Sequence, residues 1–238
     1  MQGISSRPYM RTGGNFGSPK IDLGGCVFYA PLWRQELGIA PNGTIPSSGV
    51  YGTPVHTCTV TGAVWGSQGR IFDGTDDKIA VPDAASLDLA TDLTVAVWLK
   101  PDVAGAWAGG LVKGVDASYF NNYEIYIQND AYVFNISKGS VDRSGLSFGV
   151  GSAPINTWAF LVGTFAKPTQ NVYLNGVYVT TASYNNNLVA NANDLIIGWS
   201  ASAGKYFDGV IGEVLIYNRA LTAQEIQNNY LATKWRYQ

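Results

Sequence analysis

The sequence predicts an all-β chain, a two-sheet antiparallel jelly-roll sandwich with one short helix at its C-terminus. Three observations support this fold class. Roughly a dozen short runs rich in β-branched and aromatic residues follow one another, separated by turn residues. Charged residues make up 13% of the 238 residues, against about 25% in typical domains. A helix start signal followed by an apolar helical face occurs convincingly at one place, near the C-terminus.

The chain has no internal linker, and 238 residues fit one large β domain. Residues 1–24 are rich in glycine and proline and lack hydrophobic periodicity, so we interpret them as an irregular N-terminal arm. The arm carries Tyr9, Met10 and Phe16. It is therefore either a floppy terminus or a segment that orders against a partner. We assign residues 25–238 to the jelly-roll domain.

The first expected strand covers residues 27–33, where Pro31 cannot donate to a sheet ladder. Residues 38–56 are rich in Gly, Pro, Ser and Thr and are predicted to form a long surface loop. Residues 71–81 predict a strand, a sharp acidic turn at Asp73-Gly74 and a second strand. A continuous apolar run at 93–100 predicts a central strand, which Pro101 closes.

Two hairpins follow. Alternating runs at 123–128 and 131–137 flank Asn129-Asp130, and runs at 172–174 and 177–181 flank Asn175-Gly176. Asn and Gly tolerate the positive φ angles of a type I′ turn, so the second pair is the strongest hairpin signal in the chain. Another strand is expected from residue 158 onward, and residues 195–199 and 210–217 supply two more.

The C-terminal helix is predicted from its start signal. Thr222 and Glu225 have the spacing of a capping box, with Leu221 and Ile226 in the staple positions. Ile226, Tyr230 and Leu231 then give one apolar face over roughly two turns. We expect this short helix to pack over the sandwich.

Composition argues against several functions. The net charge of −2 leaves no basic surface for nucleic-acid phosphates. The apolar runs fall well short of the ~20 residues that span a bilayer, so we expect no membrane insertion. The N-terminus lacks the apolar core of a signal peptide, which predicts release into the cytoplasm unless the sequence is an exported fragment. Cys26 and Cys58 could form one disulfide, but two buried thiols are favoured, and His56, the only histidine, is interpreted as structural.

An ordered series of motifs resembles the laminin-G-like, concanavalin A-like lectin/glucanase jelly-roll family. The motifs cover about residues 25 to 232 and lie at 72–79, 93–101, 111–114, 158–160, 172–176 and 207–222. The resemblance implies a sandwich of two antiparallel sheets with one concave face. It also implies a non-catalytic module that binds glycans or proteins, and many such modules hold a calcium ion.

Two acidic turns supply the candidate metal ligands. Asp73, Asp76 and Asp77 lie in the first turn, Asp208 in the second, and Glu213 in the strand that follows. Calcium takes six to eight oxygen ligands, so these carboxylates predict a Ca²⁺ site joining the two turns. The alternative is that Asp73 and Asp208 only form Asp-Gly turns through their own backbone. Glu213 lies in an apolar strand and needs a partner or an exposed edge.

Catalysis is not expected. Some families with this fold are glycoside hydrolases, which need two carboxylates held about 5 to 10 Å apart. The four glutamates, Glu36, Glu124, Glu213 and Glu225, do not form the Glu-x-Asp-x-x-Glu array of those enzymes. The sequence also lacks a Gly-x-Ser-x-Gly elbow and a paired-cysteine metal motif.

Aromatic and amide side chains in predicted loops are the candidate ligand-binding residues, because loops carry function more often than cores do. Strand tryptophans such as Trp98, Trp158 and Trp199 are expected in the core. The loop candidates for stacking on sugar rings and for amide hydrogen bonds are Trp107, Tyr119, Tyr123, Asn185, Asn186 and Asn187.

Our leading functional hypothesis is a structural binding module on a virion surface, such as a phage capsid decoration or tail protein made in the host cytoplasm. The N-terminal arm would attach it to capsid proteins. The alternatives are a free, extracellular carbohydrate-binding lectin and, third, a carbohydrate-active enzyme. A homo-oligomer is compatible with the first role, although no heptad repeat specifies one.

Overall fold

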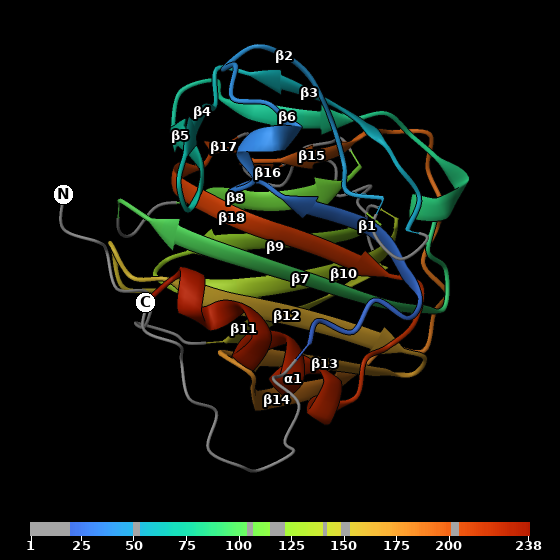
Figure 1. The fold of residues 1–238 in the computed structure, drawn as a ribbon. Coiled ribbons are helices and arrows are strands. Elements are labelled where there is room, and N and C mark those ends of the chain that lie inside the picture. The colour runs from blue at the N-terminus through green and yellow to red at the C-terminus, as the bar shows by residue number, and fades with distance from the viewer. Residues whose placement is uncertain are drawn as a thin grey trace, which may run out of the picture.

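The computed structural model describes residues 20–49, 53–103, 107–114, 122–139, 142–148, 153–200 and 205–238. Two eight-stranded antiparallel sheets pack face to face, and one short helix lies on the outer face of the first sheet (Figure 1). The predicted fold class is therefore confirmed. None of the helices in the described part of the chain has the length and apolar character needed to cross a membrane.

The first sheet has β18 and β7 at its centre. Its order is β14 (Val177–Ser183), β13 (Thr169–Leu174), β12 (Ala159–Ala166), β7 (Asp92–Pro101), β18 (Asp208–Tyr217), β5 (Gly69–Asp73) and β4 (Val64–Gly66), and β1 (Cys26–Pro31) also pairs with β18.

The second sheet is built in the same antiparallel way. Its order is β11 (Asp142–Phe148), β10 (Ala131–Gly139), β9 (Tyr123–Gln128), β8 (Ala108–Lys113), β15 (Leu195–Ile197), β6 (Lys78–Val81), β3 (Thr57–Thr61) and β2 (Gly43–Pro46). A small hairpin of β16 (Trp199–Ser200) and β17 (Lys205–Tyr206) lies against β8.

The helical segments among the described residues are α1 (Ala223–Thr233) and the 3₁₀ turns η1 (Gln35–Leu37), η3 (Ala85–Leu87) and η4 (Lys234–Arg236).

Side chains on the two faces of β7 pack against the second sheet on one side and against α1 on the other. Val95 and Val97 point between the sheets, where they join a core that includes Phe134 of the second sheet. The alternate residue Trp98 points outward, into a second apolar cluster that includes Ile226 of α1. β7 is thus covered on both faces, which is why its sequence is continuously apolar.

The predicted turns and helix start are confirmed. Asn129 and Asp130 have φ angles of 49° and 59°, and Asn175 and Gly176 have φ angles of 53° and 79°. Each pair links two antiparallel strands. Thr222 caps α1 with a full capping box to Glu225.

One prediction differs from the structure. Residues 38–56 were expected to form only a loop, but β2 pairs with β3 as an edge strand. Its Gly-Thr-Ile-Pro sequence has too little alternation to signal a strand. The predicted strand, acidic turn and second strand at 71–81 are present as β5 and β6, and because these belong to different sheets the turn at Asp73 carries the chain from one sheet to the other.

The buried thiols and the histidine are as expected. Cys26 and Cys58 are both free and buried. His56 is buried, with its Nε2 3.0 Å from the carbonyl of Val27 and its ring beside Phe28.

Candidate functional site

The first acidic turn brings three predicted metal ligands together. Carboxylate oxygens of Asp73, Asp76 and Asp77 lie within 4.8 Å of one another. Two oxygens of the group already accept backbone hydrogen bonds, Asp73 Oδ1 from Thr75 and Asp77 Oδ2 from Asp73. The remaining oxygens have the hard-donor chemistry that suits calcium, but they supply fewer than the six to eight ligands it takes, so waters or carbonyls would have to complete the shell.

Asp208 lies opposite Asp73 in the β18–β5 pairing but outside this group of three. Burial raises the pKa of Asp77, and the nearby Asp73 and Asp76 carboxylates raise it further. Burial and the charges of Asp102 and Asp73 likewise raise the pKa of Asp208. Negative charge is thus concentrated where the two sheets meet at these turns.

Glu213 was expected to join these ligands, and that prediction is wrong. It is fully buried on β18. Its carboxylate accepts hydrogen bonds from Arg236 Nη1 at 2.6 Å, from Tyr29 Oη at 3.0 Å and from Tyr237 Oη at 3.2 Å. Burial raises the pKa of Glu213, while Arg236 acts in the opposite direction. The partner that its apolar strand requires is the C-terminal arginine.

The predicted aromatic loop site is only partly assembled. Trp107 stacks on Tyr126 with ring centroids 5.5 Å apart and an interplanar angle of 4°. Tyr123 was expected in a loop, but it lies on β9 with no exposed surface, and its hydroxyl donates to the carbonyl of Leu87. The prediction of Tyr123 as a surface residue is therefore wrong. Tyr119 lies outside the described residues.

The loop at residues 185–187 forms hydrogen bonds with other parts of the domain. Asn186 Nδ2 donates to Asp142 Oδ2 at 2.7 Å, and Asn187 Oδ1 accepts from Lys167 Nζ at 2.9 Å. Asn185 is exposed. Among the described residues no hydrogen bond joins this loop to Trp107, so the two predicted halves of the site are not linked.

A pocket of about 740 Å³ lies elsewhere, where the N-terminal segment, the end of β1 and the C-terminus meet. This volume is within the range of small-molecule sites, roughly 300 to 1,000 Å³. The residues that line it are Lys20, Ile21, Asp22, Leu23, Gly24, Tyr29, Trp33, Arg34, Ala232 and Arg236.

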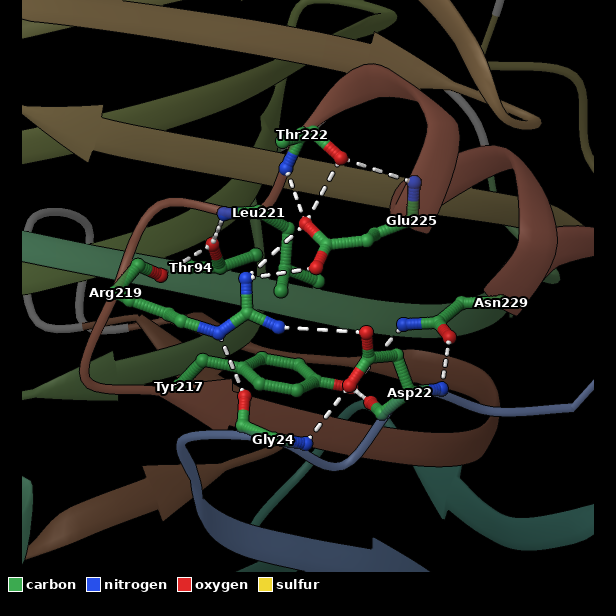
Figure 2. Close-up of polar contacts among 9 residues, drawn as sticks. All are labelled: Asp22, Gly24, Thr94, Tyr217, Arg219, Leu221, Thr222, Glu225 and Asn229. Atoms are coloured by element: carbon green, nitrogen blue, oxygen red, sulfur yellow. Dashed lines mark hydrogen bonds and ion pairs between the residues drawn. The ribbon is translucent and has the colours of Figure 1, made fainter.

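One wall of the pocket is the segment 20–24, which is fixed by specific polar contacts (Figure 2). The backbone of Asp22 donates to Asn229 Oδ1 at 2.7 Å and accepts from Tyr217 Oη at 2.7 Å. Arg219 donates from Nε to the carbonyl of Gly24 at 2.7 Å, and its Nη2 lies 3.4 Å from Asp22 Oδ2. The described end of the predicted arm is therefore docked on the domain, and residues 1–19 lie outside the described part of the chain.

Arg219 also connects this wall to α1. Its Nη1 lies 2.9 Å from the Glu225 carboxylate, which completes the capping box with Thr222. Hydrogen bonding to Arg219 lowers the pKa of Glu225 to about 2. One arginine thus joins the helix start and the docked segment.

Two further lining residues, Trp33 and Arg236, belong to a stack of aromatic and guanidinium groups. The guanidinium carbon of Arg236 lies 4.4 Å from the ring centroid of Trp33 and 4.8 Å from that of Trp235. Trp235 is 68% exposed, whereas Trp33 is partly buried. Cation–π contacts of this kind hold the guanidinium plane in place. The Arg236–Glu213 ion pair and the Tyr29 hydroxyl lie beneath the stack.

Sequence reasoning missed this pocket, although one signal was present. The dipeptide Trp-Arg occurs twice, at 33–34 and at 235–236, near opposite ends of the domain. β1 is a strand of the first sheet, paired with β18, whereas α1 packs on the outer face of that sheet. The residues that follow β1 and those that follow α1 meet at the pocket, and this brings the two dipeptides together. Their proximity depends on tertiary structure, which spacing along the chain does not reveal.

Residues 73–227 match the laminin-G-type model of the concanavalin A-like lectin/glucanases superfamily. No curated protein matches the chain.

Solved structures share the fold at low sequence identity. Sialidase of Trypanosoma rangeli is 16% identical with a TM-score of 0.65, and the match covers 91% of this chain and 34% of the sialidase. The receptor-binding domain of botulinum neurotoxin C/D mosaic serotype is 12% identical with a TM-score of 0.67, covering 88% and 52%.

The binding domain of botulinum neurotoxin DC in complex with SialylT is 13% identical with a TM-score of 0.63, covering 89% and 52%. The chain therefore spans between about a third and a half of the length of these structures. At these identities the likeness shows the fold alone.

Proposed function

This chain belongs to the concanavalin A-like lectin/glucanase superfamily, and from that premise we propose that it is a non-catalytic module that binds glycans in the pocket between its two ends. The pocket carries the proposal, because it combines a suitable volume with Trp33 and Tyr29 and with several donors. Two structural neighbours fit this class of ligand, a sialidase and a toxin binding domain solved with SialylT.

The predicted loop site is a weaker candidate for the same function. Tyr126, on which Trp107 stacks, is only 7% exposed, and its neighbours on the outer face of β9 and β10 are also covered, with Glu124 at 0% and Asn135 at 3%. A sugar stacking there would need these groups uncovered. The pocket at the chain ends requires no such rearrangement.

The experiment is dose-dependent binding of the full chain on a glycan array, with a variant that fills the pocket. Ala232 lines the pocket from the last turn of α1, so Ala232→Phe adds bulk there without removing a polar contact. Gln227→Phe, at an exposed position on the same helix, is the matched control. We expect Ala232→Phe to weaken binding at least about tenfold, equivalent to about 1.4 kcal/mol, and Gln227→Phe and Trp107→Ala to bind as wild type.

Two outcomes would overturn the proposal. If no glycan binds in a dose-dependent way, the function is wrong. If Trp107→Ala loses binding while Ala232→Phe keeps it, the site is on the second sheet and not in this pocket.

A second candidate function is attachment to a virion surface through residues 1–19. The docked segment favours it, since Asp22 and Gly24 give the arm a fixed starting point on the domain. The test adds the purified chain to virus particles that lack this protein and measures whether it co-sediments with them. Deleting residues 1–19 is expected to abolish co-sedimentation and to leave the thermal unfolding of the chain unchanged. Equal co-sedimentation of the deleted and full chains would refute attachment through the arm.

The acidic turn supports a calcium ion as a further part of the proposal. Asp73, Asp76 and Asp77 would hold it, and its charge would favour the ionised form of Asp77, whose pKa is raised by burial and further by the Asp73 and Asp76 carboxylates. A ligand that binds only the native state raises Tm. We expect Tm to rise in millimolar Ca²⁺ and to return after chelation, and Asp76→Asn to reduce this shift. An equal Tm with and without Ca²⁺ would leave these residues as turn formers.

A further inference from the structure

We infer that the ligand of this pocket is an acidic sugar, one that carries a carboxylate. The inference rests on the proposed glycan-binding function and specifies its substrate class. It is carried by the charges and donors of the pocket wall.

Cationic side chains line the pocket in excess. Lys20, Arg34 and Arg236 contribute three positive charges, and Asp22 contributes the one negative charge. The whole chain has a net charge of −2, whereas the charged residues of the lining taken alone sum to +2. The three cations come from the docked segment, the end of β1 and the C-terminal η4 turn, and they converge only in the folded chain.

Two of the three cations have carboxylate partners outside the lining. Arg34 pairs at 2.6 Å with Glu36, whose side chain is 59% exposed, and Arg236 pairs at 2.6 Å with the buried Glu213, whereas Lys20 forms no ion pair with any described residue. The carboxylate of Asp22 is already used, since Oδ1 accepts from the backbone of Gly24 and Oδ2 faces Arg219. Asp22 therefore offers a ligand little hydrogen-bonding capacity.

Two hydrogen-bond donors of the lining residues lack an acceptor among the described residues. They are the buried indole Nε1 of Trp33 and the buried Nε of Arg236. Both belong to the same stack, with Arg236 4.4 Å from the Trp33 ring. A ligand rich in acceptor oxygens complements such a wall, and a carboxylate is acceptor-only when ionised. Charge-assisted bonds to Lys and Arg are also the stronger kind.

The aromatic residues of the lining suit a ligand that contains a sugar ring. Trp33 and Tyr29 are the aromatic residues of the lining, and they lie beside its cations. Apolar faces with polar edges are a property of pyranose rings, and amphipathic aromatic side chains suit them. The pocket volume of about 740 Å³ accommodates a sugar-sized ligand.

The test compares two probes that differ only at C6, methyl glucuronide with a carboxylate and methyl glucoside with a hydroxymethyl group, by titration of the full chain at low and high salt. We expect the glucuronide to bind at least about tenfold more tightly than the glucoside, with the advantage falling as salt screens the charge. Arg34→Gln and Lys20→Gln are each expected to weaken glucuronide binding several-fold more than they weaken glucoside binding.

The variants are chosen so that folding is not at issue. Lys20 is exposed, and Arg34 contacts the exposed Glu36 and the partly buried Trp33 ring at 6.0 Å, so neither side chain belongs to the core between the sheets. Lys205→Gln removes an exposed cation of the β16–β17 hairpin and is the matched control, expected to bind as wild type.

The outcomes separate the two levels of the proposal. Equal binding of the two sugars, or neutral glycans bound in the Ala232-dependent pocket, would refute the acidic ligand and leave the glycan-binding function standing. A glycan array without any dose-dependent binding would refute the function itself, and with it this inference. Glucuronide binding that survives both Arg34→Gln and Lys20→Gln would place the charge recognition elsewhere and would also overturn it.

Discussion

Replacing Lys113 by methionine is expected to destabilise the fold more than any other single loss of charge on the second sheet. The ammonium is fully buried at the end of β8. Its Nζ lies 2.6 Å from Asp83 Oδ1, 2.8 Å from the carbonyl of Asn191 and 2.6 Å from that of Asn193. Asp88 Oδ1 is a fourth oxygen at 3.4 Å. One cation thus holds two loops against the sheet.

The magnitude follows from what is left behind. Removing one partner of a buried ion pair costs about 3–5 kcal/mol. The carboxylates of Asp83 and Asp88 are 32% and 24% exposed and can partly rehydrate, which places Lys113→Met near the lower end. A loss of about 3 kcal/mol lowers Tm by roughly 6–12 °C in a domain of this size. Methionine keeps the length of the apolar stem, so the change removes charge and not packing.

The assay is urea and thermal unfolding of wild type, Lys113→Met and a matched control. Lys100→Met is the control, because its Nζ lies 3.9 Å from Asp102 in a partly exposed pair, worth at most about 1 kcal/mol. Asp83→Asn is expected to cost less in the Lys113→Met background than in wild type, since both changes break one network. If Lys113→Met stays within about 1 kcal/mol of wild type, the two loops are held by other contacts and the reasoning fails.

Three further predictions concern acid stability and core packing. Glu225 has a pKa lowered to about 2 from an ordinary 4.5, so its stabilisation is complete above pH 4.5 and is lost between pH 4.5 and 2; Glu225→Gln should flatten that part of the Tm–pH curve. Asp208 has a raised pKa, so its ionised form disfavours the folded state; Asp208→Asn should raise Tm at pH 7 and lose this advantage as the pH falls toward 4. Gly163→Ala should destabilise by about 1–3 kcal/mol in chemical unfolding, because the new Cβ would lie 2.2 Å from the Phe134 ring.

For each of these three predictions we name a control or the outcome that would contradict it. Gly145→Ala meets only ordinary contacts, the nearest at 3.6 Å from Asn135 Oδ1, and should unfold like wild type. The Asp208 experiment is run in chelator so that metal binding does not contribute. An unchanged acid limb for Glu225→Gln, or a lower Tm at pH 7 for Asp208→Asn, would contradict the assigned pKa shifts.

Local signals predicted the fold well, because each depends on a few neighbouring residues. Positive φ at Asn175-Gly176 and the capping box at Thr222 are properties of short segments, and both appear as expected. β2 escaped prediction because an edge strand of four residues needs little periodicity of its own once β3 supplies the ladder.

The site was predicted less well, since its residues are brought together by the sheets and not by spacing. Asp73, Asp76 and Asp77 share one turn and were grouped correctly. Glu213 lies on a strand leading from the second acidic turn, yet the end of the chain folds back to place Arg236 on it. Tyr123 follows residues rich in turn signals, but its ring lies between the sheets. No local pattern distinguishes these outcomes.

The docked segment at Asp22 gives the domain a mechanical property. Five of the ten residues that line the pocket belong to residues 20–24, a segment held by hydrogen bonds and ion pairs outside any strand or helix. Pulling on residues 1–19 would break the hydrogen bonds and ion pairs of segment 20–24 first. The pocket would therefore open before the two sheets unfold. Because the ligand binds only while this segment is docked, a ligand at a hundred times its Kd would raise the free energy of detaching the segment by about 2.7 kcal/mol. A bound ligand would therefore stabilise segment 20–24 on the domain, and tension on residues 1–19 would favour release of the ligand.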